Sequence, residues 1–367
     1  MTAQPSELIV SNTSPWLANA WHPAIALEAL GHDPVRVTIL GVSYVVVRLE
    51  SSLDTSAKRA RAATEVAVFA DRCPHRNARL SQGVVIDGCL RCPYHGWTFS
   101  GDGSLVAIPA LGDHAILPST ADLAPVASTE RYGFIWIAPS VEAESPSIPS
   151  IPSIPSIEEW DDPSLTTVWL PSVTIGAGAA QFIDNFLDFA HFPFVHAGTF
   201  GAGESPLLPP YTVTRSLDGW GAFVDITHSI ANHEDPLVVT GDHALIQPRR
   251  MRFTYGAPFV VLLRLDLPVS GVVNAILTFC TPVSEGETIV HTAMMRNDIP
   301  TADLARAAVD YELAVMAEDL VVIENLPDRF LDLTPRAQAH TRADRITVEY
   351  RRILASLARA DAAADEA

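Results

Sequence analysis

The first 140 residues alternate between short apolar runs and polar breaks that contain Gly, Pro, Asp and Asn. The apolar runs are rich in β-branched residues and cover residues 42–49, 66–70, 84–86 and 134–137. Runs of this length between turn-forming residues predict short β-strands. We expect the polar stretch 51–61 to be a loop between two of them, so the N-terminal part is predicted to be all β.

A low-complexity segment follows, in which Ser-Ile-Pro occurs three times over residues 147–155. Proline at every third position favours an extended, polyproline-like chain over a helix or a paired strand. We therefore predict a linker at residues 146–158. It separates an N-terminal domain, residues 1–145, from a C-terminal domain, residues 159–367.

Beyond the linker, strand-like segments return and are accompanied by helices. The predicted strands are residues 166–170, 211–214, 222–229, 251–255, 259–265, 274–280 and 288–295. One helix is expected at residues 181–191, stopped near Pro193, and a longer one at residues 301–325 with Thr301 as the N-cap. A last helix is expected at residues 343–357. Strands backed by long helices indicate an α+β domain.

Composition and charge narrow the class of protein. The chain has 367 residues, enough for two domains, and its 48% hydrophobic and 18% charged content is typical of a globular protein. The formal net charge of −19 argues against nucleic acid as a partner, because phosphate binding needs a basic surface. No apolar run is long enough to cross a bilayer, and residues 1–10 lack the features of a secretory signal. We expect a cytoplasmic protein.

Three of the four cysteines lie within twenty residues of one another, close to histidines. Cys73 is followed two residues later by His75, and Cys92 three residues later by His95. Two loops that each present one thiolate and one imidazole favour a [2Fe–2S] cluster with Cys on one iron and His on the other. Structural zinc is the alternative, because Cys89 and Cys92 have the spacing of half a zinc site.

The surrounding residues resemble a known family. The segments DRCPHRNARLSQG (71–83), CPYHGW (92–97) and GFIW (133–136) are similar to the Rieske domain of ring-hydroxylating and demethylating oxygenases. The resemblance implies that Cys73, His75, Cys92 and His95 bind the cluster.

A second motif, Asn-x-x-Asp-x-x-His-x4-His, is formed by Asn185, Asp188, His191 and His196. On a helix Asp184, Asp188 and His191 would share one face. Pro193 would end that helix and let the chain turn His196 back toward His191. Two imidazoles and one carboxylate make a facial triad, which leaves one side of Fe(II) open for O₂ and substrate.

The same oxygenase family carries this motif, which implies that His191 and His196 bind a mononuclear iron. The family's third ligand is an Asp on a late helix, and Asp319 matches it. Glu318 is the alternative, and its side chain points about 100° away around the helix. The resemblance covers nearly the whole chain. It implies an α+β fold, with an all-β Rieske domain followed by a helix-grip (START-like) catalytic domain built from an antiparallel sheet and long helices.

The resemblance also implies an activity, that of a terminal oxygenase in the group of vanillate O-demethylase and dicamba monooxygenase. We expect monooxygenation of a small aromatic or heterocyclic substrate, by hydroxylation or by oxidative O- or N-demethylation. The alternatives are cis-dihydroxylation of an arene, N-oxygenation of an amine, and a non-catalytic Rieske electron-transfer protein. The pocket is expected to be lined by sheet strands together with Phe189 and Phe194.

Partners are implied as well. The resemblance implies a homotrimer in which Asp188 bridges His191 to His95 of the neighbouring subunit, and in which Asn185 lies close to the iron. No Gly-x-Gly-x-x-Gly motif follows a strand, so electrons from NAD(P)H are expected to arrive through a separate reductase, directly or through a ferredoxin. Four arginines within one short stretch form either a solubilising surface or a docking rim for this partner. They are Arg72, Arg76, Arg79 and Arg91.

Overall fold

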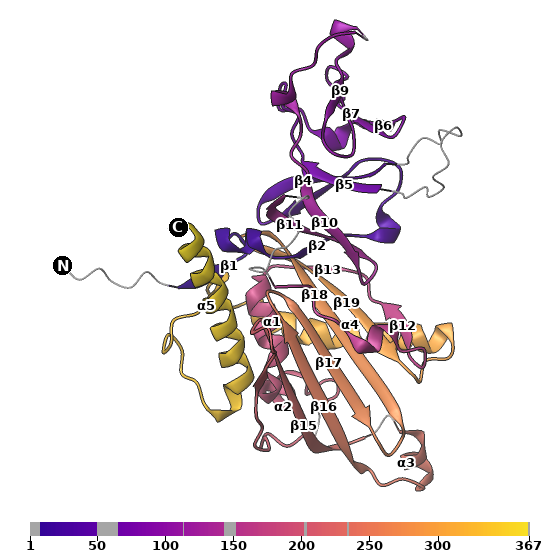
Figure 1. The fold of residues 1–367 in the computed structure, drawn as a ribbon. Coiled ribbons are helices and arrows are strands. Elements are labelled where there is room, and N and C mark those ends of the chain that lie inside the picture. The colour runs from indigo at the N-terminus through magenta and orange to yellow at the C-terminus, as the bar shows by residue number, and fades with distance from the viewer. Residues whose placement is uncertain are drawn as a thin grey trace, which may run out of the picture. The chain divides into compact units, whose positions relative to one another are not determined.

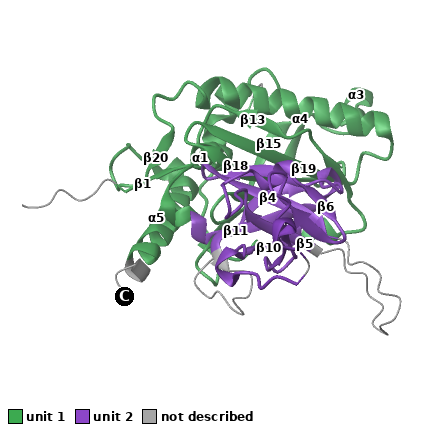
Figure 2. Cartoon of the chain, turned by 90° about the horizontal axis from the view of Figure 1, so that it is seen from above, with its two compact units in different colours: residues 1–17, 152–367 green, residues 18–151 purple. Residues whose placement is uncertain are grey.

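A computed structural model describes residues 8–49, 65–112, 114–142, 152–201, 204–232 and 235–365. The loop expected at residues 51–61 and most of the Ser-Ile-Pro repeat lie outside these residues. The chain divides into two compact units, one of residues 18–151 and one of residues 1–17 and 152–367 (Figure 2).

In the unit of residues 18–151, the described residues form three small antiparallel sheets (Figure 1). The first contains β3 (Val35–Ile39), β4 (Val42–Leu49) and β5 (Glu65–Ala70); the second contains β10 (Val126–Arg131), β11 (Phe134–Glu142) and β2 (His22–Ala26); the third contains β6 (Val84–Ile86), β7 (Cys89–Arg91), β8 (Thr98–Phe99) and β9 (Leu105–Ala107). The four strands predicted here are all present, and the all-β character of this unit is confirmed.

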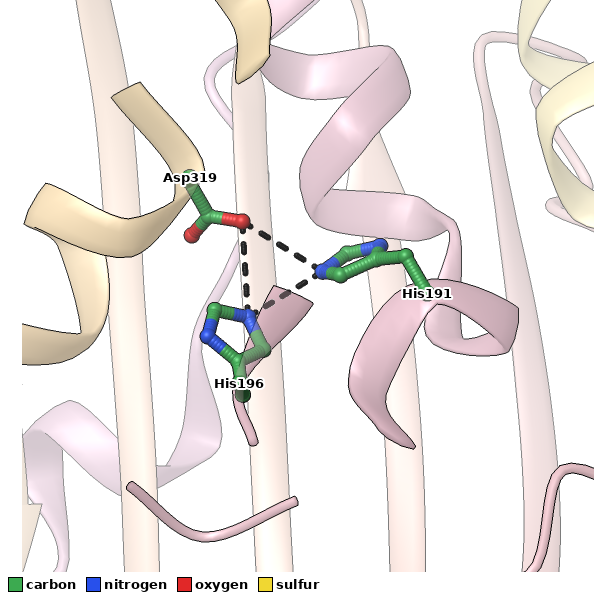
Figure 3. A group of neighbouring side chains, drawn as sticks. All are labelled: His191, His196 and Asp319. Atoms are coloured by element: carbon green, nitrogen blue, oxygen red, sulfur yellow. Dashed lines mark hydrogen bonds and ion pairs between the residues drawn. The ribbon is translucent and has the colours of Figure 1, made fainter. Parts of the chain in front are cut away.

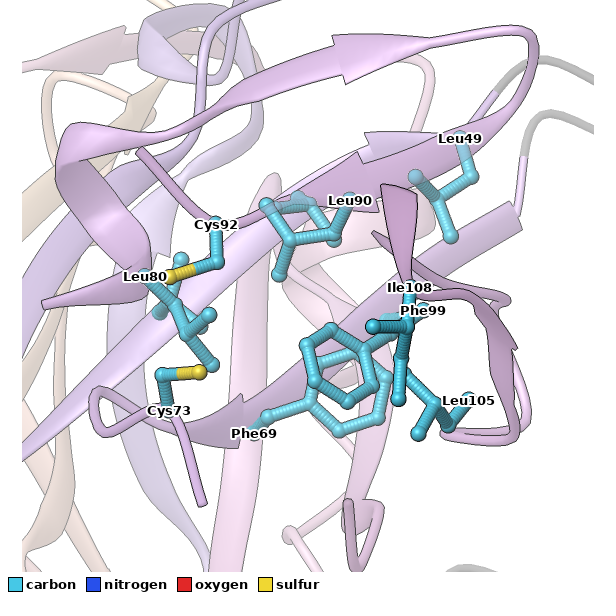
Figure 4. Close-up of a cluster of buried hydrophobic side chains, with 12 residues drawn as sticks. Leu49, Phe69, Cys73, Leu80, Leu90, Cys92, Phe99, Leu105 and Ile108 are labelled. Atoms are coloured by element: carbon cyan, nitrogen blue, oxygen red, sulfur yellow. The ribbon is translucent and has the colours of Figure 1, made fainter. Parts of the chain in front are cut away.

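Strand β4 shows why the sequence pattern was informative here. Val45 and Val47 point into one buried cluster, whereas Val46, between them, points into another. Successive side chains of a strand face opposite sides, so a strand buried on both faces becomes a continuous run of valines. One of the two clusters contains Cys73 and Cys92 at one end (Figure 4).

The other unit is built on one large antiparallel sheet with the strand order β12-β19-β18-β17-β16-β15-β14, and β13 also pairs with β19. The strands are β12 (Thr166–Trp169), β13 (Val173–Ile175), β14 (Thr214–Arg215), β15 (Gly221–Ala231), β16 (Ile246–Gly256), β17 (Val260–Leu267), β18 (Val272–Ser284) and β19 (Glu287–Arg296). Most are longer than predicted, because pairing with the neighbouring strand continues beyond the apolar runs on which the prediction rested. The strand expected at residues 211–214 is wrong except at Thr214, because the short β14 covers only Thr214–Arg215.

In the part of this unit that the structure describes, the α-helices beside the sheet are α1 (Ala179–Leu187), α2 (Phe192–Val195), α3 (Pro236–Thr240), α4 (Ala302–Ile323) and α5 (Arg345–Asp365). The Thr301 hydroxyl accepts a hydrogen bond from the Leu304 amide, so the predicted N-cap of the long helix is confirmed. The antiparallel sheet with long helices confirms the predicted α+β class. None of the helices that the described residues form is both long and apolar enough to span a membrane.

The N-terminal segment differs from the expectation, since it packs with the C-terminal unit. Strand β1 (Ile9–Ser11) pairs with β20 (Phe330–Asp332). The buried Asn12 amide donates to the carbonyls of Ser284 and Glu287 and to the Thr288 hydroxyl, while its oxygen accepts from the Ala179 amide. This one side chain connects the segment both to the turn between β18 and β19 and to the start of α1.

Candidate metal centres and active-site cavity

Two loops with the same hydrogen-bond pattern bring the four predicted cluster residues together. The Cys73 carbonyl accepts from the Asn77 amide and the Cys92 carbonyl from the Gly96 amide, four residues on in each loop. Asn77 and Gly96 both have positive φ, 59° and 71°. The left-handed conformation turns each chain back on itself, so each loop presents its cysteine and its histidine on one side.

The cysteines and histidines of the two loops are neighbours. Cys73 and Cys92 are buried, and burial, with the adjacent Cys92 thiol, raises the pKa of Cys73 to about 11. The rings of His75 and His95 lie 4.5 Å apart between centroids. The Trp97 ring stacks on His75 at 4.5 Å, nearly parallel, and so shields it from solvent.

The donor set fits a metal cluster. His75 Nδ1 is buried and has no hydrogen-bond partner among the described residues, which is costly unless a metal or another group satisfies it. Metal binding would also convert the two buried thiols into thiolates, as ligation requires. Cys89 begins β7 and is half-buried, so it lies on the incoming strand as expected, although it is less buried than a core residue.

The helix that carries the start of the second motif is shorter than predicted. Helix α1 ends at Leu187, and Asp188 is extended, with φ −86° and ψ 99°. The Asp188 carboxylate accepts from the Ala190 amide and thereby caps the 3₁₀ turn that carries His191. The expectation that Asp184, Asp188 and His191 share a helix face is therefore wrong. Asp184 instead pairs with Arg351 at 2.7 Å.

Pro193 has a different role from the one predicted. It lies in the first turn of α2, a position that tolerates proline because its missing N–H would have no helical partner. The single turn of α2 then carries the chain round to His196. His196 faces His191 as expected, although it is helix initiation rather than helix termination at Pro193 that brings it there.

Three side chains converge on one point in this unit (Figure 3). His191 Nε2 and His196 Nε2 are 3.1 Å apart, and Asp319 Oδ1 lies 3.3 Å from the first and 3.4 Å from the second. Two ligand atoms at right angles and about 2.1 Å from a metal are about 3.0 Å apart. The triangle formed by His191 Nε2, His196 Nε2 and Asp319 Oδ1 therefore matches one face of an octahedral iron site.

A hydrogen bond from a neighbouring amide orients Asp319. Asn185 Nδ2 donates to Asp319 Oδ1 at 2.8 Å. Burial opposes ionisation of Asp319, but its polar contacts with His191, His196 and Asn185 outweigh burial and lower the pKa of Asp319 to about 2. An ionised carboxylate between two imidazoles is the state that a divalent cation requires.

Glu318, the alternative ligand, does not point at the shared atoms. Its Oε2 lies 3.0 Å from His196 Nδ1 and accepts a hydrogen bond of 2.7 Å from the Thr199 hydroxyl. A carboxylate on Nδ1 fixes the tautomer in which Nε2 keeps its lone pair for a metal. The sequence contained no signal for this role of Glu318 and Thr199, because it depends on how α4 is rotated.

A cavity of about 230 Å³ adjoins the triangle. Its wall is formed by α1, α4 and the strands β15 to β19, and includes Phe182, Leu263, Ile276, Val315 and Met316. Phe189 and Phe194, which were expected in the lining, are not part of it: Phe189 packs on Phe253 and Tyr211, and Phe194 is 71% exposed.

The fold and the two donor clusters together define a two-centre iron oxygenase. Residues 20–124 match the Rieske [2Fe-2S] domain, and residues 175–360 match the vanillate O-demethylase oxygenase C-terminal domain. The chain belongs to this family of Rieske non-haem iron oxygenases. It is an oxidoreductase with a Rieske cluster, a mononuclear non-haem iron and O₂ as co-substrate.

Individual relatives are similar over nearly their full length. Methylxanthine N1-demethylase NdmA of Pseudomonas putida is 26% identical over 360 residues, which cover 96% of this chain and 92% of NdmA. The structure of an NdmA mutant with theobromine superposes with a TM-score of 0.74 at 26% identity, covering 92% of this chain and 90% of that chain. Dicamba monooxygenase bound to 3,6-dichlorosalicylic acid shares the fold, with a TM-score of 0.75 at 21% identity over 95% of this chain and 99% of that chain.

Proposed function

We propose that Cys73, His75, Cys92 and His95 bind the Rieske cluster, and that His191, His196 and Asp319 bind the mononuclear iron. The convergence of the last three on one point, with spacings of 3.1 to 3.4 Å, carries this assignment. The assignment of the cluster ligands is supported by the buried Nδ1 of His75, which has no hydrogen-bond partner among the described residues, and by the two buried thiols of Cys73 and Cys92.

When bound, the cluster supplies single electrons and the mononuclear iron supplies the site at which O₂ is activated. The chain's own residues prepare that site. Glu318 and Asn185 hold His196 and Asp319 in position, so the side facing the cavity stays open for O₂ and substrate. Arg249, buried on the cavity wall, is held by Glu204 at 2.7 Å and by His228 at 3.0 Å. Because these contacts hold the Arg249 side chain in place, the cavity wall can orient a bound substrate.

The reaction that we propose is monooxygenation, by hydroxylation or by oxidative removal of a methyl group from O or N. A cavity of about 230 Å³ is at the small end for ligand pockets, so the substrate is one or two rings in size. Its lining is mostly apolar, which suits an aromatic or heterocyclic ring. The similarity to NdmA, a methylxanthine demethylase, supports demethylation.

Electron supply requires partners. We propose a homotrimer in which Asp188 connects His191 to His95 of the neighbouring subunit. Asp188 Oδ2 lies 4.0 Å from His191 Nδ1, and its side chain is 37% exposed, so one oxygen remains accessible to a neighbour. A separate reductase or ferredoxin, in the cytoplasm, would deliver electrons from NAD(P)H. The exposed Arg72, Arg76 and Arg79 are suited to dock such an acidic partner.

Metal analysis tests the central assignment. Iron-replete protein should contain three irons per chain and give the electron paramagnetic resonance signal of a reduced Rieske cluster. Asp319→Ala should contain two irons and keep the signal. Turnover is then tested with a surrogate reductase on methoxyarenes, N-methyl heterocycles, simple arenes and aryl amines. Formaldehyde release would identify demethylation, whereas a cis-diol or an N-oxide would replace our proposal with one of those reactions.

A further inference from the structure

One acidic side chain on the cavity wall has no role in holding the iron. Glu312 lies on α4, seven residues before Asp319, with Met316 between them, and all three line the cavity. Residues at i, i+4 and i+7 share one face of a helix, and seven residues correspond to about 10 Å along the helix axis. Glu312 therefore stands about the length of a bicyclic ring system away from the metal ligand.

The Glu312 carboxylate lacks a counterion. No side chain in the described part of the chain forms a hydrogen bond or ion pair with it. The two arginines of the cavity wall are engaged elsewhere: Arg249 with Glu204 and Arg296 with Asp298, at 2.7 and 2.8 Å. Burial raises the pKa of Glu312 to about 7, and neither Arg296 nor any other group compensates it fully.

Other polar groups of the wall are also acceptors, and a chain of hydrogen bonds fixes one of them. The Asp235 carboxylate can only accept, so Gln247 donates to it through Nε2, at 2.7 Å. Gln247 Oε1 must then accept, and it does so from Asn232 Nδ2 at 3.0 Å. This network fixes the orientation of the Asn232 amide and leaves its Oδ1 as an acceptor that takes no part in the chain of hydrogen bonds.

A second amide on the cavity wall, that of Asn274, also offers an acceptor. Asn274 Oδ1, on β18, is buried without a hydrogen-bond partner among the residues that the structure describes. The hydroxyls of Thr278 and Thr292 are hydrogen-bonded to each other at 3.0 Å. The wall of the cavity thus offers a carboxylate and two amide oxygens, and both of its cations are already neutralised by carboxylates.

We propose that Glu312 is a specificity-determining residue that binds a hydrogen-donating nitrogen of the substrate, best a protonated amine, at the end remote from the oxidised carbon. This inference rests on the proposed function, since it names the substrate class of the same cavity. Substrates with a carboxylate at that end are excluded, because they would face the Glu312 carboxylate on a cavity wall whose two arginines are already paired with other carboxylates.

The test uses three probes that share a methoxyarene ring and differ in charge: 3-methoxybenzylamine, 3-methoxybenzyl alcohol and 3-methoxybenzoate. Calorimetry on the oxidised holoenzyme measures their binding without turnover. We expect the amine to bind most tightly and the benzoate least. Glu312→Gln, which keeps the shape but removes the charge, should weaken amine binding about 10- to 100-fold, raise its KM more than it lowers kcat, and leave the alcohol nearly unchanged.

Asp303→Asn is the matched control, because it removes one carboxylate from the same helix at an exposed position outside the cavity. It should change none of the three affinities. Equal affinities for the three probes, no measurable affinity for the amine, or an equal effect of Glu312→Gln on all three would overturn the proposal. Failure of the oxygenase assignment would look different, since O₂ consumption and the third iron would then be absent whatever the order of binding.

Discussion

Glu318 and His196 are joined by a contact of 3.0 Å between Oε2 and Nδ1, on the side of the imidazole that faces away from Asp319. Neighbouring residues of one helix turn thus act on the two sides of the same histidine. Asp319 points to the nitrogen that faces the shared ligand position, and Glu318 holds the other nitrogen.

Removing this support should loosen the iron without touching the cluster. We expect Glu318→Ala to lower the affinity for Fe(II) about 10- to 100-fold, as is typical when a histidine ligand loses its orienting carboxylate. Iron titration of the metal-depleted protein measures the effect. Thr199→Val, which removes only the hydroxyl that binds Glu318, should have a smaller effect, and an equal loss in both variants would argue against the orienting role.

Asp188 should be needed for electron transfer between centres and not for building them. Asp188→Asn keeps an oxygen that can accept from the Ala190 amide, but it removes the charge that would hold two imidazoles. We expect normal iron content, a cluster that chemical reductants still reduce, and a loss of turnover of at least about 100-fold. The loss of turnover is measured by single-turnover kinetics after chemical reduction of the cluster. Normal turnover would remove the bridging role.

The arginine cluster should affect the rate of reduction alone. Replacing Arg76 and Arg79 by Gln should slow reduction by the reductase or ferredoxin at low ionic strength and flatten its salt dependence, because steering by exposed charges is screened by salt. Stopped-flow reduction at several salt concentrations measures both. Arg306→Gln, an exposed arginine on α4 in the other unit, is the control. If the double variant is reduced at an unchanged rate, the arginines serve as a solubilising surface and not as a docking rim.

Asn12 should be important for stability. Asn12→Ala removes the donor to the carbonyls of Ser284 and Glu287 and the acceptor of the Ala179 amide, whereas the Thr288 hydroxyl keeps its bond to the Ala177 carbonyl. Unsatisfied buried groups cost about 1–3 kcal/mol each, with losses that are not additive. We expect a loss of about 3 kcal/mol, measured as a lower midpoint of denaturant unfolding. Thr13→Ala, at the exposed neighbouring position, should change the midpoint little.

The ends of a strand could be predicted where most of its positions are apolar because both of its faces are buried. Strand β4 was predicted with its observed ends because both faces are buried. Strand β16 extends back to Ile246, through Gln247 and Arg249, and these polar residues face a cavity and a hydrogen-bond network. Their local pattern does not resemble a strand, and only pairing with β15 makes them one.

The candidate site, like the strands, could be predicted only in part. The spacing of His191 and His196 pointed to two neighbouring imidazoles, but the end of α1 could not be predicted, because Asp188 favours its own cap over one more helical turn. Glu318 and Asp319 could be distinguished only by the resemblance, since the rotation of α4 is set by packing. Glu312 gave no signal at all, because an unpaired acid looks like any surface residue until a cavity is found beside it.

The Asn12 connection constrains the order of assembly. Asn12 leaves the ribosome before its partner Thr288, which lies 276 residues later in the chain. At about 5–20 residues per second of synthesis, that separation corresponds to roughly 15–55 seconds. During this interval β1 and Asn12 have neither β20 nor the turn between β18 and β19 to bind, so this segment can join the C-terminal unit only after those strands have been made.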